Sequence, residues 1–349
     1  YNSNLSLQSR NFFSNAQRTL RTRDDSQLTV RADYDLIFDT PGAIDELSMI
    51  AVNANSIADV SAGHDLLLNI GVVAPNVHVD TGGKANLTAG NDMTLSAAGK
   101  DAGNPLASNL YVNDGTITAK VIDGTLSISN DGAVGAYADN GGSITLEGPV
   151  VMDVGTGAAA ANDGAILFKG PLTLHGTDTA LRAVDGGVIH ADAADTEKYI
   201  DGNVVAQGGT VSIDLNKVGS YLTGTTSVSD GTASALERAA AADSRTGMLN
   251  VTLGNGTVWN VTGNSSLTNL TNNGVVHMTD SSRTGQEVMA KTLSGTGTMA
   301  MDLDWLSNQG TKGATANSDY LKVTDSAAGT QALVSDPTVM NLDKMAVND

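Results

Sequence analysis

The sequence predicts an all-β protein, a right-handed parallel β-helix (a β-solenoid) with a cap at each end. Glycines that precede short alternating segments recur at steps of 22, 23, 22 and 22 residues, at Gly142, Gly164, Gly187, Gly209 and Gly231. A unit of this size cannot bury its own apolar face, so such repeats fold by stacking on their neighbours. Aromatic residues make up only 4% of the chain, which suits a narrow core of aliphatic side chains.

Three short strands are predicted in each repeat. The segment Gly-Ser-Ile-Thr-Leu-Glu-Gly-Pro-Val from Gly142 recurs as Gly-Ala-Ile-Leu-Phe-Lys-Gly-Pro-Leu from Gly164. Apolar residues at every second position predict strands with one buried face; those two residues past the glycine are Ile144, Ile166, Ile189 and Val211. A second apolar segment follows the Gly-Pro pair and a third is alanine-rich, giving three strands and about three turns per coil. Crossovers between parallel strands favour the right hand.

The N-terminal segment, residues 1–31, differs from the repeats. It lacks glycine and holds five of the nine arginines, namely Arg10, Arg18, Arg21, Arg23 and Arg31. We expect either an N-terminal cap that covers the open end of the first coil or an arm whose arginines dock on an acidic surface. The segment has no apolar core of a secretory signal, so the chain is expected to be a mature or trimmed fragment.

Residues 32–246 form the predicted β-helix repeat region. Turn signals before Gly142 are irregularly spaced, so coils there should carry longer loops, with an excursion at Asn104-Pro105. Residues 195–200 and 233–243 break the strand pattern. The second of these has strong helix formers, which predicts a short helix or a flexible loop that projects from the stack.

Residues 247–349 form the predicted C-terminal capping region, which contains both tryptophans, Trp259 and Trp305. Four sub-motifs follow one another at 256–276, 293–297, 301–304 and 317–324. In order and spacing they resemble the pertactin-type C-terminal region of autotransporter passengers, the autochaperone region. The upstream repeats are similar to passengers of the antigen 43 and AIDA adhesin group.

This resemblance implies a right-handed parallel β-helix that is exported by the Sec pathway and reaches the bacterial cell surface through the periplasm and outer membrane (type V secretion). It also implies a C-terminal outer-membrane β-barrel of the same protein as a partner, expected beyond Asp349. The residues that would build the autochaperone-like cap, with a structural role, are Trp259, Leu267, Leu270, Gly295, Gly297, Trp305 and Tyr320.

Composition excludes several classes of function. A formal net charge of −19 argues against nucleic acid, whose phosphates need lysine and arginine, and against adsorption to an anionic membrane. There is no cysteine, so disulfides, zinc-thiolate sites and thiol nucleophiles are excluded. No apolar run approaches the roughly 18 residues of a membrane-spanning helix.

No catalytic, cofactor or metal site is predicted. The five histidines, His64, His78, His175, His190 and His277, are scattered, and no serine-hydrolase motif occurs. His175 and His190 lie in neighbouring coils at different distances from the turn glycine, so stacking should not pair them. The closest carboxylate groupings are Asp24-Asp25 and Asp192 with Asp195.

These observations predict a non-enzymatic, surface-displayed or secreted autotransporter passenger that acts in adhesion, autoaggregation or biofilm formation. About 14 coils spaced by about 4.8 Å give a rod on the order of 65 Å long. Asn, Asp, Thr and Ser on its outer faces should stack into ladders that dock on copies of itself on neighbouring cells, or on a host surface protein or glycan. The alternative is a carbohydrate-active β-helix, glycan-binding or lyase-like. Specific recognition is expected where the repeat is irregular.

Overall fold

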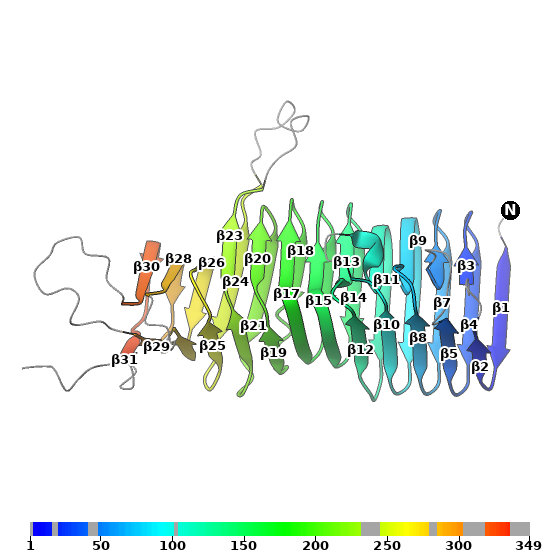
Figure 1. Cartoon of the computed structure of the whole chain (residues 1–349), viewed down its shortest axis with the longest axis horizontal. Coiled ribbons are helices and arrows are strands. Elements are labelled where there is room, and N and C mark those ends of the chain that lie inside the picture. Colours follow the sequence, from blue (N-terminus) through cyan, green and yellow to red (C-terminus); the bar gives the residue numbers. More distant parts are fainter. Residues whose placement is uncertain are drawn as a thin grey trace, which may run out of the picture.

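The computed structural model describes residues 3–15, 20–40, 48–100, 104–231, 245–278, 285–302 and 318–335. It confirms the predicted all-β fold, because thirty-one strands in these residues join one ladder of parallel neighbours. A single described turn of 3-10 helix, η1 (Pro105–Ala107), accompanies them. Figure 1 shows an elongated parallel β-helix with β1 at one end and β30 and β31 at the other.

The strands lie on three faces that run along the rod. Seven long strands bend round a corner and serve two faces: β9 (Val77–Ala89), β11 (Leu110–Val121), β15 (Val150–Ala160), β17 (Leu172–Val184), β26 (Ser265–Asn272), β28 (Glu287–Ser294) and β30 (Tyr320–Ala327). The later halves of β9, β11, β26, β28 and β30 join face one with β1 (Asn4–Ser9), β4 (Gln27–Ala32), β7 (Ile57–Ala62), β14 (Ser143–Glu147), β16 (Ala165–Phe168), β18 (Val188–Ala191), β21 (Thr210–Leu215) and β24 (Met248–Leu253).

Face two takes the first halves of β15 and β17 together with β2 (Phe12–Ser14), β5 (Leu36–Thr40), β8 (Leu66–Ile70), β10 (Met93–Ala97), β12 (Leu126–Asn130), β19 (Lys198–Asp201), β22 (Tyr221–Gly224), β25 (Val258–Val261), β27 (Val275–His277), β29 (Thr298–Met301) and β31 (Ala332–Ser335). Face three takes the remaining halves of the long strands with β3 (Leu20–Thr22), β6 (Ile50–Val52), β13 (Val134–Asp139), β20 (Val204–Gln207) and β23 (Thr226–Ser229). Face one therefore has thirteen rungs in the described residues, and twelve steps of about 4.8 Å span about 58 Å.

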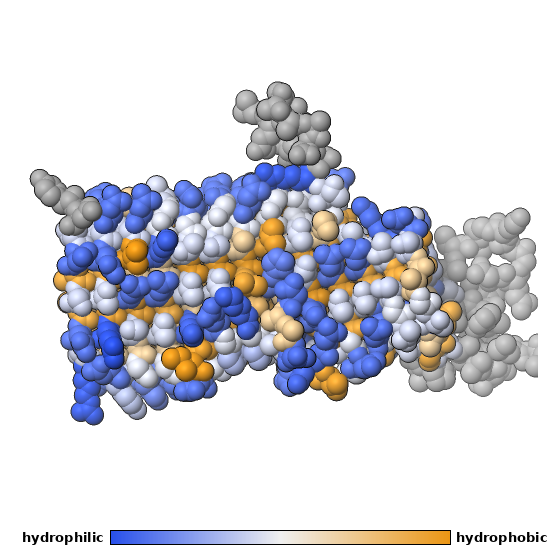
Figure 2. Space-filling model, turned by 180° about the vertical axis from the view of Figure 1, so that it is seen from behind, coloured by the Kyte–Doolittle hydropathy of each residue, from blue (hydrophilic) through white to orange (hydrophobic). Residues whose placement is uncertain are grey.

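Inward side chains at equivalent positions stack in rows that form the core. The row that follows the repeat glycine on face one is fully buried and consists of Ile117, Ile144, Ile166, Ile189, Val211 and Leu249. Each such side chain contributes about 1.5–3 kcal/mol by its burial. The predicted alternation is confirmed, and Figure 2 shows polar and apolar residues in bands along the long axis.

The repeat glycines follow tight turns whose geometry explains them. Before Gly187, Asp185 and Gly186 have φ of 46° and 85°, and the Gly187 amide donates to the Val184 carbonyl at 2.8 Å. This is a type I′ turn, which favours Asn, Asp and Gly. A Cβ on Gly187 would lie 2.1 Å from the carbonyl oxygen of Ala160 in the preceding coil, so close stacking of the coils requires glycine there.

The last step of the predicted repeat is wrong. Thr210, which follows Gly209, pairs with Met248, so Gly247 rather than Gly231 precedes the next coil. Between Gly231 and this coil lies the segment 232–244, and the helix or loop predicted at 233–243 falls outside the described residues. Extra residues between two strands leave the strand pairing intact, so a constant period fails here.

The N-terminal residues form the first coil of the stack where they are described. Strands β1 to β3 come from the segment expected to be a cap or an arm, and β1 pairs in parallel with β4. Leu7 and Phe12 continue the inward rows of the next coil, which is the physical reason that this segment joins the stack. The expected boundary after Arg31 falls inside β4. At the other end, the strands from β24 onward continue the same β-helix.

The interior also contains a lysine. Lys198 begins β19, in a segment that was predicted to break the strand pattern, and only 1% of it is exposed. Its Nζ donates to the Ala193 carbonyl at 2.8 Å and to the Thr196 hydroxyl at 2.8 Å. Burial lowers the pKa of Lys198, while Asp214 and Asp192 oppose this shift. Turn oxygens thus stabilise this amine at the position where the preceding coil places Leu172.

Candidate functional site

The outward side chains of face three include a row of three neighbouring rings, tilted by 45° and 56° to one another. His78, Tyr111 and Tyr137 occupy equivalent positions in three successive coils. The ring centroids of His78 and Tyr111 are 4.9 Å apart, and those of Tyr111 and Tyr137 are 5.9 Å apart. Ring pairs at such distances attract one another beyond the effect of burial. We refer to these three residues as the aromatic row.

Two arginines occupy the same register position as the rings, one beyond each end of the aromatic row. Along the helix axis the order is Arg21, Ala51, His78, Tyr111, Tyr137, Ala159 and Arg182. One alanine stands between each arginine and the rings, Ala51 on one side and Ala159 on the other. Face three therefore presents an aromatic centre with a cation at each side.

A second outward row runs beside the rings and is made of carboxylates and amides. It comprises Asp80, Asn113 and Asp139, each two residues after a ring, and we call it the acid-amide row. Asn113 Nδ2 donates to Asp80 Oδ1 at 3.0 Å. Asn162 Nδ2 donates to Asp139 Oδ1 at 2.8 Å. These bonds fix the row, and each carboxylate keeps further lone pairs for a ligand.

The two rows influence each other electrostatically. Burial, followed by the carboxylates of Asp139 and Asp80, raises the pKa of Tyr111 to about 12. Burial and Asp139 also raise the pKa of Tyr137, against the opposing effect of Arg182. Burial lowers the pKa of His78, against Asp80. The hydroxyls of both tyrosines therefore stay protonated at neutral pH and can donate hydrogen bonds.

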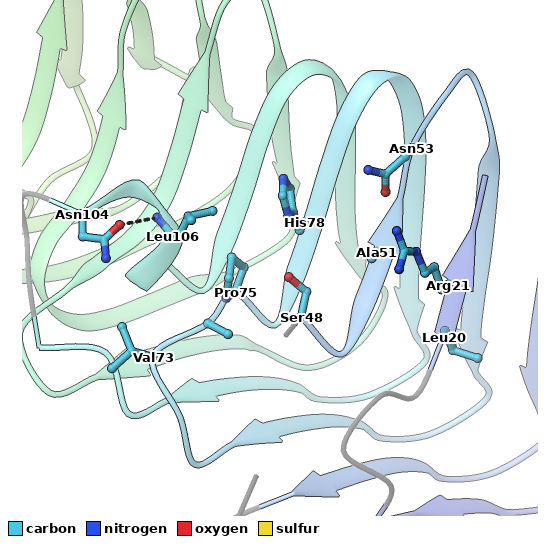
Figure 3. Close-up of a pocket in the computed structure, with 11 residues that line it drawn as sticks. Leu20, Arg21, Ser48, Ala51, Asn53, Val73, Pro75, His78, Asn104 and Leu106 are labelled. Carbon is cyan, nitrogen blue, oxygen red and sulfur yellow. Dashed lines mark hydrogen bonds between the residues drawn. The ribbon is translucent and has the colours of Figure 1, made fainter. Parts of the chain in front are cut away.

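A pocket of about 320 Å³ opens at the His78 end of the aromatic row. Figure 3 shows His78 in its middle, with Leu20 and Arg21 of β3 on one side and Leu106 on the other. Leu106 is 47% exposed. An exposed apolar side chain beside a concave wall of mixed polarity is typical of a ligand site.

Local sequence explains how Leu106 comes to lie there. Asn104 caps η1, since its Oδ1 accepts from the amide of Leu106 at 3.1 Å, and Pro105 occupies the first helical position. Ser108 Oγ donates back to the Pro105 carbonyl. The excursion predicted at Asn104-Pro105 is thus a built wall of the pocket, in the irregular part of the repeat.

A compact group of ligand atoms occurs at the corner between faces one and two. Histidine, cysteine, aspartate and glutamate side chains can bind a metal ion. Among the described residues, one group of three has its ligand atoms within 4.8 Å of one another, and it consists of Asp35, His64 and Asp65. His64 Nδ1 lies 3.0 Å from Asp35 Oδ1 and 3.2 Å from Asp65 Oδ2. The His64 ring stacks on Tyr34 at 4.5 Å.

The same carboxylates already link successive coils. Asp35 Oδ1 accepts from the amide of Asp65 at 3.3 Å, and Asp65 Oδ1 accepts from the amide of Asp92 at 3.1 Å. Asp92 Oδ1 accepts in turn from the amide of Thr125 at 2.8 Å. The carboxylates at this corner therefore link the turns of successive coils by hydrogen bonds.

Sequence reasoning missed both groups, although each leaves a signal. The corner is encoded by Ala-Asp-Tyr-Asp-Leu from Ala32, Ala-Gly-His-Asp-Leu from Ala62 and Ala-Gly-Asn-Asp-Met from Ala89. The aromatic row is encoded by a four-residue pattern of small or apolar residue, ring, small or apolar residue and Asp or Asn, starting at residues 77, 110 and 136. Their unequal steps hid them from a search for one fixed period.

The predicted cap residues are not gathered in one place. Trp259, Leu267 and Leu270 are buried on faces two, three and one respectively, and Trp259 Nε1 donates to the Gly224 carbonyl at 3.1 Å.

Gly295 and Gly297 lie against Asn272, and a Cβ on Gly295 would lie 2.2 Å from its carbonyl oxygen. Tyr320 is 50% exposed and donates to Glu287 Oε2 at 2.7 Å. Trp305 lies outside the described residues.

The predicted separation of His175 from His190 is confirmed. His175 stacks between Asp153 and Asp201 on face two, whereas His190 pairs with Leu167 on face one. In comparisons with family models, curated proteins and solved structures, none matched this chain. Within the described ranges no helix has the length and apolarity needed to cross a bilayer.

Proposed function

We propose that this chain is a non-enzymatic adhesive rod, a passenger of the autotransporter type that is displayed at or released from a bacterial surface. The observation that carries this proposal is a row along face one in which most side chains can form hydrogen bonds. The parallel β-helix fold and the sequence resemblance of the C-terminal region support it. The proposed route to the surface is type V secretion through the periplasm and outer membrane.

This polar row has thirteen members, eleven of which are hydroxyl, amide or carboxylate side chains. They are Ser6, Thr29, Asp59, Asn86, Thr118, Thr145, Leu167, His190, Ser212, Asn250, Asn269, Thr292 and Ser326. Several bond to the next rung, as Asn269 Nδ2 does to Asn250 Oδ1 at 2.7 Å and Thr292 Oγ1 to Asn269 Oδ1 at 2.6 Å. The predicted outer ladders are therefore present.

A repeating row of this kind suits contact with a second copy. A single new hydrogen bond contributes only about 0.5–1.5 kcal/mol net. Many such bonds along two aligned rods add up, because each later contact forms at high effective concentration. The proposed partner is thus a copy of the chain on a neighbouring cell, with a host surface protein or glycan as the alternative partner.

Sedimentation velocity of the purified chain tests this self-association. The double variant Asn250→Asp and Asn269→Asp places two charges in the polar row, so it should shift the chain toward monomer. Asn260→Asp, an outward asparagine of face two, is the matched control and should leave the association unchanged. A chain that is monomeric at all concentrations and also fails to bind host matrix or glycan surfaces would overturn the proposal.

A further inference from the structure

The aromatic row of face three suits a different partner from the polar row of face one. Its three ring residues are partly exposed, and the acid-amide row supplies acceptors and donors two residues away. From Arg21 to Arg182 there are six steps, and at about 4.8 Å each they cover about 29 Å. This length accommodates several units of a linear polymer.

The charges around the rings select among polymers. Asp80 and Asp139 lie beside the rings, and Arg21 and Arg182 lie at the two ends, so the four formal charges cancel. A polyanion would meet the carboxylates at the centre, and a polycation would meet the arginines at the ends. A neutral ligand rich in hydroxyl groups meets neither obstacle and can bond to both kinds of side chain.

Ring geometry favours sugars over other neutral ligands. A pyranose offers an apolar face of C–H groups that stacks on tyrosine, while its hydroxyls reach the polar groups at the ring edge. The row is straight, because its members share one register position in consecutive rungs. A straight row matches an extended β-linked glycan better than a glycan that curls.

We propose that face three binds an extended, neutral, β-linked glycan. Its sugar rings stack along His78, Tyr111 and Tyr137, and the pocket beside His78 takes a terminal or branching unit. Asn113 and the two carboxylates of the acid-amide row hold its hydroxyls. This inference rests on the proposed adhesive function, since it names the chemical class of a partner for that rod.

Isothermal titration calorimetry of the full chain with cellohexaose tests the proposal. Maltohexaose serves as the curled neutral probe, a hyaluronan hexasaccharide as the acidic probe and hexalysine as the basic probe. Cellohexaose should bind, and the other three should bind at least tenfold more weakly. Equal or tighter binding of any of the three would overturn the assignment, as would the absence of cellohexaose binding.

Variants locate the site. Tyr111→Ala should raise the dissociation constant for cellohexaose at least tenfold, and Tyr111→Phe, which keeps the ring, should raise it less. Tyr199→Ala is the matched control, because Tyr199 stacks on Tyr221 at 5.4 Å on face two, and it should bind as the unaltered chain does. If Tyr111→Ala fails to fold, Tyr137→Ala replaces it with the same expectation. Unchanged affinity in the ring variants would overturn the proposal.

The two proposals fail separately. If cells that display the chain adhere or settle but cellohexaose does not bind, the glycan site is wrong and the adhesive function stands. If cellohexaose binds at Tyr111 but displaying cells neither settle nor adhere to any surface, the adhesive function is wrong.

Discussion

Replacing Asn109 by alanine should loosen the coils around it far more than the same change at the surface. Asn109 is completely buried in the corner between faces two and three. Its Nδ2 donates to Asn76 Oδ1 at 2.9 Å, and to the carbonyls of Leu95 at 3.1 Å and Ser129 at 2.9 Å. Its Oδ1 accepts from Asn130 Nδ2 at 2.8 Å. The side chain thus links three successive coils.

The size of the effect follows from three full hydrogen bonds, because the two hydrogens of Nδ2 are shared among three acceptors and Oδ1 accepts one more bond. At about 1 kcal/mol net for each, their loss should cost about 3 kcal/mol. Because about 1.4 kcal/mol corresponds to a factor of ten, amide exchange in the affected coils should accelerate up to about a hundredfold. Each coil contacts only its neighbours, so the effect should stay local.

Hydrogen exchange followed by mass spectrometry measures this directly. Peptides from β10 to β13 should lose protection in Asn109→Ala, whereas peptides from β24 to β27 should not change. The control is Asn86→Ala, which removes an exposed bond to Asp59 Oδ1 at 2.7 Å and should have little effect. Equal exchange in the two variants, or a loss of protection spread evenly along the rod, would refute the reasoning.

Three further predictions concern the turns, the aromatic row and the polar row. Gly187→Ala should lower the free energy of unfolding by about 1–3 kcal/mol through overpacking, since its Cβ would lie 2.1 Å from a carbonyl oxygen. Gly263→Ala, whose nearest neighbour is the Thr225 methyl at 3.3 Å, should cost less, and equal urea midpoints would contradict this. The pKa of Tyr111, raised to about 12 from about 10 in the unfolded chain, contributes stability that is complete below pH about 10 and is lost as the pH rises through about 12. Tyr111→Phe should therefore flatten the fall in stability over this range, and a phenolate absorbance at Tyr111 that titrates near pH 10 would disprove the shift. Self-association of a chain with net charge −19 should strengthen from about 0.01 M to about 1 M salt, because the Debye length falls from about 30 to about 3 Å. If sedimentation velocity shows less association at high salt, the result would speak against the polar row.

The fold was predictable because its main determinant is local and periodic. Ile144 and Ile166 stand at the same distance from their turn glycines, and alternation around them assigns one side to the core. The turns were equally predictable from the sequence, since residues such as Asp185 and Gly186 tolerate the positive φ that a type I′ turn needs.

Other features depend on contacts between coils of unequal length. Gly231 sits at the right spacing, yet the equivalent position is Gly247. The break in the strand pattern at 233–243 marks an interruption, but only the strand pairing shows where the register resumes. Asn109 precedes a strand as an ordinary turn residue would, and only stacking shows that it is buried among carbonyls. Lys198 is comparable, because its amine is satisfied by turn oxygens that the chain order does not identify.

The candidate site was hidden for the same reason. His78, Tyr111 and Tyr137 are separated by 33 and 26 residues and meet only because intervening loops differ in length. The pocket beside His78 lies in the irregular coils, and recognition there stays a prediction. Longer loops leave the strand register unchanged and add walls above it.

Settling of cells that display the chain tests the central claim, an adhesive rod, most directly. Bacteria that carry the unaltered chain at their surface should settle from suspension or adhere to a host surface, and the double variant Asn250→Asp and Asn269→Asp should not settle. Cells that stay dispersed and fail to adhere, with the chain shown to be folded and exposed at their surface, would contradict the account.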